Sequence, residues 1–272
     1  MPNVFAETIS AAIADLTANG FDSETRIAFW SAKLREAAKE SMISEDEMQR
    51  LLKERLTDAY IKMVDRGGLE KQHSGIPRFT IEKVKPQLRA ELDRRILAAA
   101  NLIKLNRTAA VEKTIQRFQG WATSIPKGGS NVVAKGETKD DIRKALASLP
   151  YEERRVIVDQ GHKFAANLSD ILATDGGAIA AIWRHHHVTY PRPEHVERDG
   201  DVFLIRDSWA HREGLVKPAG PKGYTDSIEM PGELPLCRCT YSYYFHLRDL
   251  PQDMLTAKGK AALAEVRSRA AA

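Results

Sequence analysis

The chain has 272 residues, with 41 Lys and Arg against 37 Asp and Glu, and a formal net charge of +4. This length supports one large domain or two of ordinary size. The composition, 43% hydrophobic and 29% charged, is ordinary for a globular protein with a buried core. Two cysteines cannot form a disulfide framework, and neither a secretory signal nor an apolar run long enough for a membrane span is evident. We therefore expect no membrane association, and the modest charge permits nucleic-acid contact without arguing for it.

The first segments of the chain have helical periodicity. Apolar residues recur every three or four positions over 5–18 and over 25–41, which predicts two amphipathic helices. A capping box of the S-x-x-E type at Ser44 opens a third helix, which we expect to end at Gly67.

A loop is predicted over 70–77, and the longest helical pattern follows it over 81–119. This pattern predicts either one helix or two with a break, and Pro86 falls early, where a first turn tolerates proline. Its basic side chains are accompanied by acidic ones, which favours a solvated helix face over a DNA-binding track. The basic residues are Arg94, Arg95, Lys104, Arg107, Lys113 and Arg117.

The stretch 124–139 is rich in Gly, Ser and Lys, and it predicts a flexible linker at a domain boundary. Beyond it we expect a short helix over 138–147 that is stopped by Pro150. A second helix is predicted over 151–174.

The last hundred residues differ in composition and pattern, with short apolar or β-prone runs and many Gly and Pro residues. An irregular excursion is predicted over 214–235 and a terminal helix over 255–270. The predicted strands fall in 178–183, 185–190, 202–205 and 237–245.

The predicted fold class is α+β: a helical N-terminal half with a long helix, followed by a small mixed α/β C-terminal module. The predicted segments are a helical domain over 1–123, a linker over 124–139, the C-terminal module over 140–250 and a terminal helix over 251–272.

Histidines and cysteines form the first candidate site. His185 and His187 would share one face of a strand, and so would Cys237 and Cys239. Together with His195 they include the ligand types of a zinc site, although C-x-C is shorter than the usual spacing. The alternative is that the thiols are two small reduced side chains, one buried and one half-exposed, and that the histidines form a polar strand end or loop. We predict no cofactor and keep zinc at these residues as the alternative.

Glu194, His195 and Asp199 are candidates for general acid–base catalysis. However, the sequence contains no nucleophile elbow, phosphate-binding loop, H-E-x-x-H motif or dinucleotide fingerprint. We therefore predict that the protein is not an enzyme.

Three pieces in order carry a resemblance: Trp183, the segment R-P-E-H-V-E-R-D-G over 192–200, and P-G-E-(L-P-L)-C-R-C-T over 231–240. This set resembles the C-terminal module of phage head morphogenesis proteins, the Mu F-like minor head proteins, over about 145–250. The family usually has an acidic residue between the Trp and the His, which is missing here. The residues that carry the motif are Trp183, Arg192, His195, Asp199, Gly200, Cys237, Arg238, Cys239 and Thr240.

The resemblance implies a structural role in the virion. Such proteins are minor components of the procapsid that associate with the portal protein, help head assembly and in some cases influence DNA packaging or ejection. The implied partners are portal and major capsid or scaffold protein, with packaged DNA nearby. The implied location is the host cytoplasm during assembly and then the virion head, where both cysteines would start as reduced thiols.

Two alternatives remain. The first is a metal-dependent enzyme or toxin-type module that uses the His, Cys and Glu residues, since a related module occurs in polymorphic toxins. The second is a DNA-binding internal virion protein.

Overall fold

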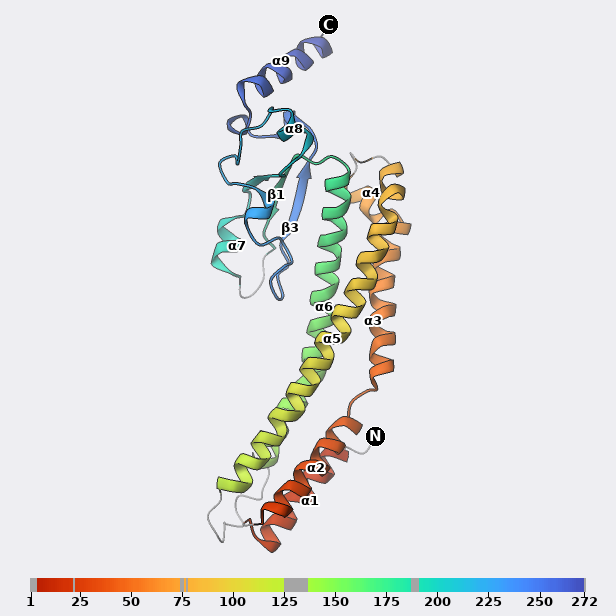
Figure 1. Cartoon of the computed structure of the whole chain (residues 1–272), viewed down its shortest axis with the longest axis vertical. Helices are drawn as coiled ribbons and strands as arrows, with labels where there is room; N and C mark the ends of the chain where they lie inside the picture. The colour runs from red at the N-terminus through yellow and green to blue at the C-terminus, as the bar shows by residue number, and fades with distance from the viewer. Residues whose placement is uncertain are drawn as a thin grey trace. The chain divides into compact units, whose positions relative to one another are not determined.

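The structure is a computed structural model that describes residues 4–21, 23–73, 76, 78–124, 137–186 and 191–271 (Figure 1). It confirms the α+β class, with long helices and a small antiparallel sheet in the C-terminal part. The chain forms two compact units, each built from discontinuous segments. Unit one contains Met1–Leu52 and Leu97–Ile157, and unit two contains Lys53–Ile96 and Val158–Ala272. The four segments proposed from sequence follow other boundaries and stay a prediction.

Unit one is helical. Its first helices are α1 (Val4–Asn19) and α2 (Glu24–Glu40), in agreement with the periodicity of the sequence. The side chain of Ser23 caps α2 by accepting a hydrogen bond from the backbone N–H of Arg26 at 3.2 Å. The apolar stripes of both helices are buried in one core with the last turns of α5 (Arg78–Ser124). That core includes Phe5, Ile9, Ile13, Leu16, Leu34, Ile115 and Phe118.

The third helix, α3 (Glu45–Tyr60), starts at the predicted capping box and continues into a π-helical segment, Ile61–Asp65. The prediction of a loop over 70–77 is wrong at its start, because α4 (Gly68–Gln72) is helical. Leu69 is fully buried in the core of unit two, and this tertiary burial fixes a turn of helix that the local sequence does not require.

The long helical pattern is one helix, because α5 runs without interruption over 47 residues. Pro86 lies inside this helix rather than in its first turn, so that placement was wrong. Buried side chains before and after the proline hold the backbone helical, and they include Ile81, Val84, Leu88 and Leu92.

The helix after the linker is also continuous. α6 (Glu137–Asp175) contains Pro150, which was expected to end it. A proline inside a helix costs about 3 kcal/mol, and burial of Ile142 and Leu149 before it and of Phe164 after it offsets that cost. The predicted linker lies mostly at 125–136, outside the described residues.

A three-stranded antiparallel sheet organises the C-terminal part of unit two. Its strands are β1 (Ala180–Arg184), β2 (Val202–Leu204) and β3 (Thr240–Tyr244), in the order β2-β1-β3. β1 is central and pairs Ala181 with Phe203 on one side and with Tyr243 on the other. The loops that flank β2 and β3 therefore meet at the two ends of β1.

Two strand predictions differ from the structure. β3 begins at Thr240, so Cys237 and Cys239 precede the strand instead of lying on it. His185 and His186 follow β1 in irregular structure, and the rest of the predicted strand over 185–190 lies outside the described residues. Arg184 and His186 are exposed and His185 is half-buried, so these three residues present no buried face that would hold them in the sheet.

Short helices and loops complete the module. The helices are α7 (Pro193–Glu197), α8 (Trp209–Arg212) and α9 (Ala257–Ala271). The excursion over 214–235 is irregular, as predicted, with a single 3-10 turn at Thr225–Ser227. No helix of the described part of the chain is long and apolar enough to cross a membrane.

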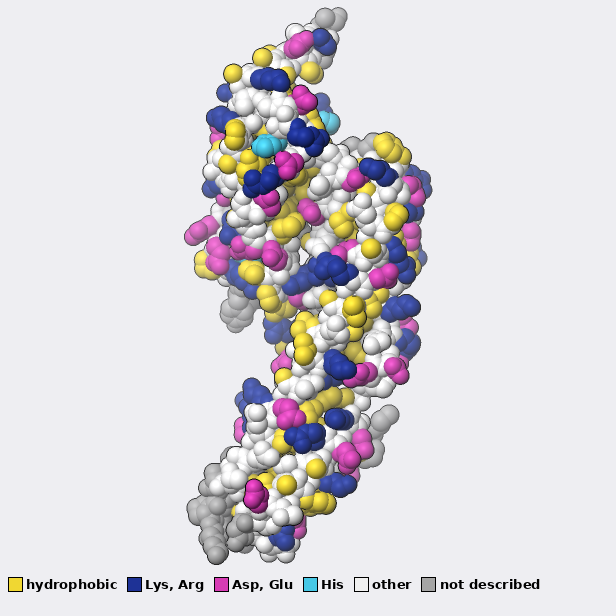
Figure 2. All heavy atoms as spheres, viewed as in Figure 1, with side chains coloured by type: hydrophobic (Ala, Val, Ile, Leu, Met, Phe, Trp, Pro, Cys, Tyr) yellow, Lys and Arg dark blue, Asp and Glu magenta, His cyan; other side chains and the backbone are white. Residues whose placement is uncertain are grey.

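The basic side chains of α5 are mostly engaged with carboxylates, as the solvated-face prediction requires. On the face shown in Figure 2, cationic and anionic side chains are interspersed over each unit. The pairs along α5 are Arg94 and Arg95 with Glu91, Lys104 with Glu45, Arg107 with Glu153, and Arg117 with Asp141.

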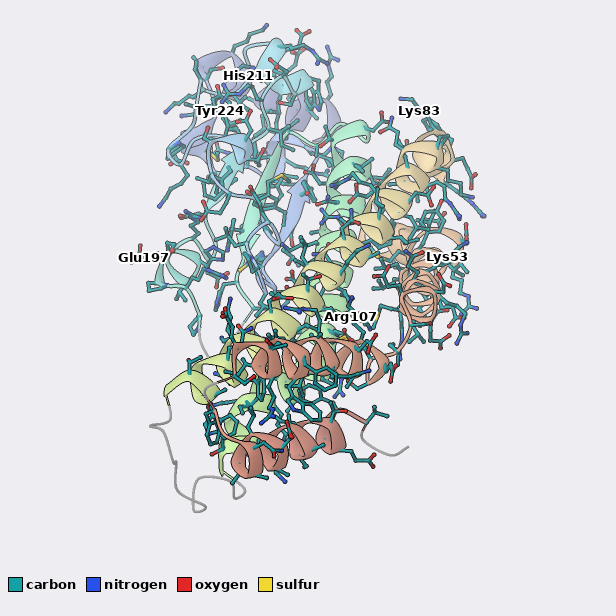
Figure 3. The ribbon with its side chains drawn as sticks, turned by 60° about the horizontal axis from the view of Figure 1, so that its bottom comes forward. Lys53, Lys83, Arg107, Glu197, His211 and Tyr224 are labelled. Carbon is teal, nitrogen blue, oxygen red and sulfur yellow. The ribbon has the colours of Figure 1, made fainter. Side chains whose placement is uncertain are left out.

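Arg107, labelled on α5 in Figure 3, is the most buried of these cations in unit one. It binds Glu153 and also donates to the carbonyl oxygen of Ile43 at 2.8 Å. The side chains of Arg107 and Glu153 are only 10% and 11% exposed.

Replacing Arg107 with Met leaves the Glu153 carboxylate buried without its partner. Loss of one member of a buried ion pair costs about 3–5 kcal/mol, so R107M should lower the free energy of unfolding of unit one by that order. The double variant R107M/E153M should recover most of the loss. Urea unfolding monitored by far-UV circular dichroism measures both.

The matched control is Arg143→Met, which removes an exposed ion pair with Asp140 in the same unit. An exposed pair contributes about 0–1 kcal/mol. Equal losses for R107M and R143M would contradict the assignment of Arg107 as a buried structural cation.

Candidate functional site

Trp183 lies at the centre of the candidate site. Its indole is fully buried on β1 and makes edge-on contacts with the rings of His195 and Tyr241, at centroid distances of 5.1 and 5.7 Å. The guanidinium of Arg198 lies 5.3 Å from the indole centroid. The indole therefore joins β1 to β3 and to the segment that contains α7.

The turn after α7 places His195 against Trp183. Gly200 adopts a φ of +84° and donates its N–H to the Trp183 carbonyl at 3.0 Å, while Asp201 accepts from the Trp183 N–H at 2.9 Å. A left-handed φ at this point favours glycine. Asp199, one residue earlier, accepts a hydrogen bond from the backbone of His185 at 2.9 Å.

The two cysteines come from the loop between the excursion and β3. Leu236 has a φ of +61°, a strained value for a branched side chain, and its N–H donates to Asp159 on α6 at 2.6 Å. Lys163 on α6 donates to the carbonyl of Glu233 at 2.8 Å. These contacts turn the chain so that Cys237 and Cys239 are both buried.

His195, Cys237 and Cys239 form what we call the His–Cys–Cys cluster. The Nδ1 atom of His195 lies 3.5 Å from Sγ of Cys237 and 3.6 Å from Sγ of Cys239. All three ligand atoms lie within 4.8 Å of one another. On the opposite side of the ring, Nε2 lies 3.6 Å from Oε1 of Glu229, which Arg198 binds at 2.9 Å.

The two thiols differ in acidity. Hydrogen bonding from Cys239, followed by the N–H of Gly232 at 3.4 Å, lowers the pKa of Cys237 to about 5. The same contact with Cys237, together with burial, raises the pKa of Cys239. Cys237 is therefore the more acidic of the two coupled thiols.

A pocket of about 240 Å³ opens beside the cluster. The three cluster residues line one side of it. The other lining side chains are mostly basic or imidazole groups, and the backbone of the 235–236 turn closes the rim. The remaining lining residues are His185, His186, Pro191, Arg192, Pro235, Leu236 and Arg238.

The structure brings together three of the five residues considered as zinc ligands. His195, Cys237 and Cys239 meet, although the cysteines do so from a loop and not from one face of a strand. His185 lines the adjoining pocket, and His187 lies outside the described residues.

The remaining motif residues surround the cluster. Arg192 occupies the N-cap position of α7, and its side chain donates to the carbonyl of Pro235 at 2.9 Å, which joins two segments of the motif. Arg238 is exposed at the pocket, and Thr240 opens β3 opposite Arg184. Glu194, an acid–base candidate, is exposed in the first turn of α7.

Sequence reasoning missed Glu229, Arg198 as its partner, and Asp159. Glu229 lies in the irregular excursion, where no periodic pattern singles out a residue. Arg198 lies in the 192–200 motif segment, but only the fold shows that its side chain crosses Trp183 to reach Glu229.

Comparison of the chain with protein-family models, with curated proteins and with solved structures finds no match. The site is therefore assigned from its geometry and from the order of its motif residues.

Gly200 allows a test of the turn that positions His195. A Cβ at Gly200 would meet no atom within 4 Å, so only the left-handed φ opposes substitution. That conformation costs an L-residue about 1–2 kcal/mol, and Gly200→Ala should lower the free energy of unfolding of unit two by this amount.

Gly161 in α6 is the matched control, because a Cβ there also meets open space but the backbone is helical. Gly161→Ala should raise stability by up to about 1 kcal/mol. Chemical denaturation of both variants measures the difference, and a destabilised G161A with a neutral G200A would contradict the role of the turn.

A buried carboxyl group on α6, which bonds to a residue of β3, also has a shifted pKa. Asp170 on α6 accepts a hydrogen bond from the hydroxyl of Tyr243 at 3.0 Å. Burial raises the pKa of Asp170 above its usual value, despite the opposing effect of that hydrogen bond. The folded state therefore favours the protonated carboxyl, and stability falls as the pH rises from about 4, the unfolded value, through the folded pKa.

Asp170→Asn keeps an acceptor for Tyr243 and removes the buried charge. We expect a higher midpoint of thermal unfolding than wild type at pH 7, with the difference shrinking as the pH is lowered toward about 4. Differential scanning calorimetry across this range checks it. A difference that is independent of pH would contradict the assignment.

Proposed function

We propose that this protein is a phage minor head protein, a non-enzymatic component that associates with the portal protein during procapsid assembly. The observation that carries the proposal is the convergence of the ordered motif. Trp183, the 192–200 segment and the 231–240 segment are far apart in sequence, yet they pack on one another in unit two. The residues that carry the resemblance occur in the same order as in the family, and they also pack together. This packing supports the resemblance.

The proposed location follows from this role. The protein would work in the host cytoplasm during assembly and then in the virion head, in contact with portal and with major capsid or scaffold protein. Charge favours this role over that of a DNA-binding internal protein, since most basic residues of α5 already have carboxylate partners.

Unit one supplies a surface suited to such a partner. Leu97, Leu102 and Leu105 are exposed within about two turns of α5, at 63%, 36% and 66%. Exposed apolar side chains that group on one element are typical of protein contact sites. We propose that this part of α5 contacts the portal protein.

The test is retention of purified portal protein from the same phage, with the full-length protein immobilised. The double variant Leu97→Ser/Leu105→Ser should retain at least about tenfold less portal, a loss of about 1.4 kcal/mol or more. Point variants are preferable to deletion of 1–125, because each compact unit contains segments from both sides of that boundary.

The control is Val266→Ser, which removes a side chain of 63% exposure on α9 in the other unit. It should retain as much portal as the wild type. If the wild-type chain retains no portal, the proposed function is wrong. If both variants bind as the wild type does, the contact surface on α5 is wrong.

A further inference from the structure

We propose that His195, Cys237 and Cys239 bind one Zn²⁺ ion, with the fourth coordination position open to the adjoining pocket. This inference concerns the cluster alone and does not depend on the association with portal. It is carried by the distances between the ligand atoms, by the group behind the histidine and by the pocket in front of the thiols.

The spacing of the ligand atoms fits zinc. With about 2.0–2.1 Å to nitrogen, about 2.3 Å to sulfur and a tetrahedral angle, the nitrogen and a sulfur lie about 3.5 Å apart. The observed separations from Nδ1 of His195 to the two sulfurs are 3.5 and 3.6 Å. An ion could therefore sit between the three atoms with little movement of the side chains.

The donor set selects the class of metal. Thiolate and imidazole are ligands for zinc and other thiophilic ions, whereas magnesium and calcium take oxygen ligands. The N–H of Gly232 lies 3.4 Å from Sγ of Cys237, where it would donate a hydrogen bond to a metal-bound sulfur.

Glu229 supplies the outer partner that metal-bound histidines usually have. Its Oε1 faces Nε2 of His195 at 3.6 Å, on the side of the ring away from the sulfurs. A proton on Nε2 leaves the lone pair of Nδ1 directed at the thiols. Nε2 is buried and has no hydrogen-bond partner in the described part of the chain, so Glu229 would close on it when the ring is held by metal.

The pocket determines what kind of site this is. All three ligands are buried, and all three also line the pocket, so the remaining coordination position faces the side on which His185 and Arg192 lie. Three protein ligands with one open position allow a water molecule or an exchangeable ligand to complete the tetrahedron.

The experiment is titration of the reduced, metal-free, full-length chain with Co²⁺ alone, followed by displacement with Zn²⁺. Cobalt bound to thiolates gives an intense sulfur-to-metal charge-transfer band. We expect saturation at one ion per chain and loss of the band on addition of Zn²⁺. Elemental analysis of protein purified without chelator should show one zinc per chain.

Three variants and one control test whether the metal binds at the His–Cys–Cys cluster. Cys237→Ser and Cys239→Ser should each lose at least a hundredfold in affinity with a weaker charge-transfer band. Glu229→Gln keeps every ligand and should lose about 10–100-fold while the band stays. His246→Ala removes an exposed imidazole of the same unit and should bind as the wild type does.

A Cys→Ser variant that fails to fold would not decide the matter, so alkylation of the wild-type thiols is the second measurement. Zn²⁺ should protect both cysteines from iodoacetamide, and a chelator should expose them, as read by mass spectrometry. A folded, reduced wild-type chain that binds no Co²⁺ would overturn the proposal. So would Co²⁺ binding that survives both Cys→Ser substitutions, or protection that is independent of metal.

Discussion

The burial of the Trp183 indole is the interaction on which the C-terminal module depends. The residue lies on the central strand, and its ring contacts side chains from α7 and from β3. A fully buried aromatic ring is among the largest single apolar contributions available to a module of this size. The three-stranded sheet alone is too small to hold the long loops around it, so the loops gain their order by packing on this ring.

Specific polar contacts then hold the parts that apolar packing does not reach. The excursion over 214–235 has almost no regular structure, so its backbone is fixed at separate points. Arg206 binds Asp226, and His211 contacts the hydroxyl of Tyr224, which also accepts from the N–H of Ala219. Each contact is modest, but together they fix residues 219–226 of the excursion against the segment 206–211.

Periodic patterns made the helices predictable. The stripes of α1 and α2 and the capping box of α3 are local signals, and the structure follows them. Pro150 was misleading, because local chemistry opposes a helix there while buried side chains on both sides require one. Tertiary packing of this kind is invisible in a local pattern.

The site was predictable only in part, for a related reason. His195 and the two cysteines could be picked out by residue type and order, yet the assumption that the cysteines share a strand face was wrong. What brings both sulfurs to one imidazole is the left-handed turn at Leu236, held by Asp159. No sequence pattern identified Glu229, because a carboxylate in an irregular segment can be given a role only from its neighbours in the folded chain.

Two of the three acid–base candidates from the sequence lie outside the His–Cys–Cys cluster. Glu194 is exposed on the surface of α7, and Asp199 accepts a hydrogen bond from the backbone of His185. The groups that do face the pocket are cationic or imidazole side chains, Arg192 and Arg238 among them. Arg192 already donates to the 235 carbonyl, which ties α7 to the cysteine loop. The contacts of Arg192, Asp159 and His195 therefore join three separate segments of the chain around the cluster.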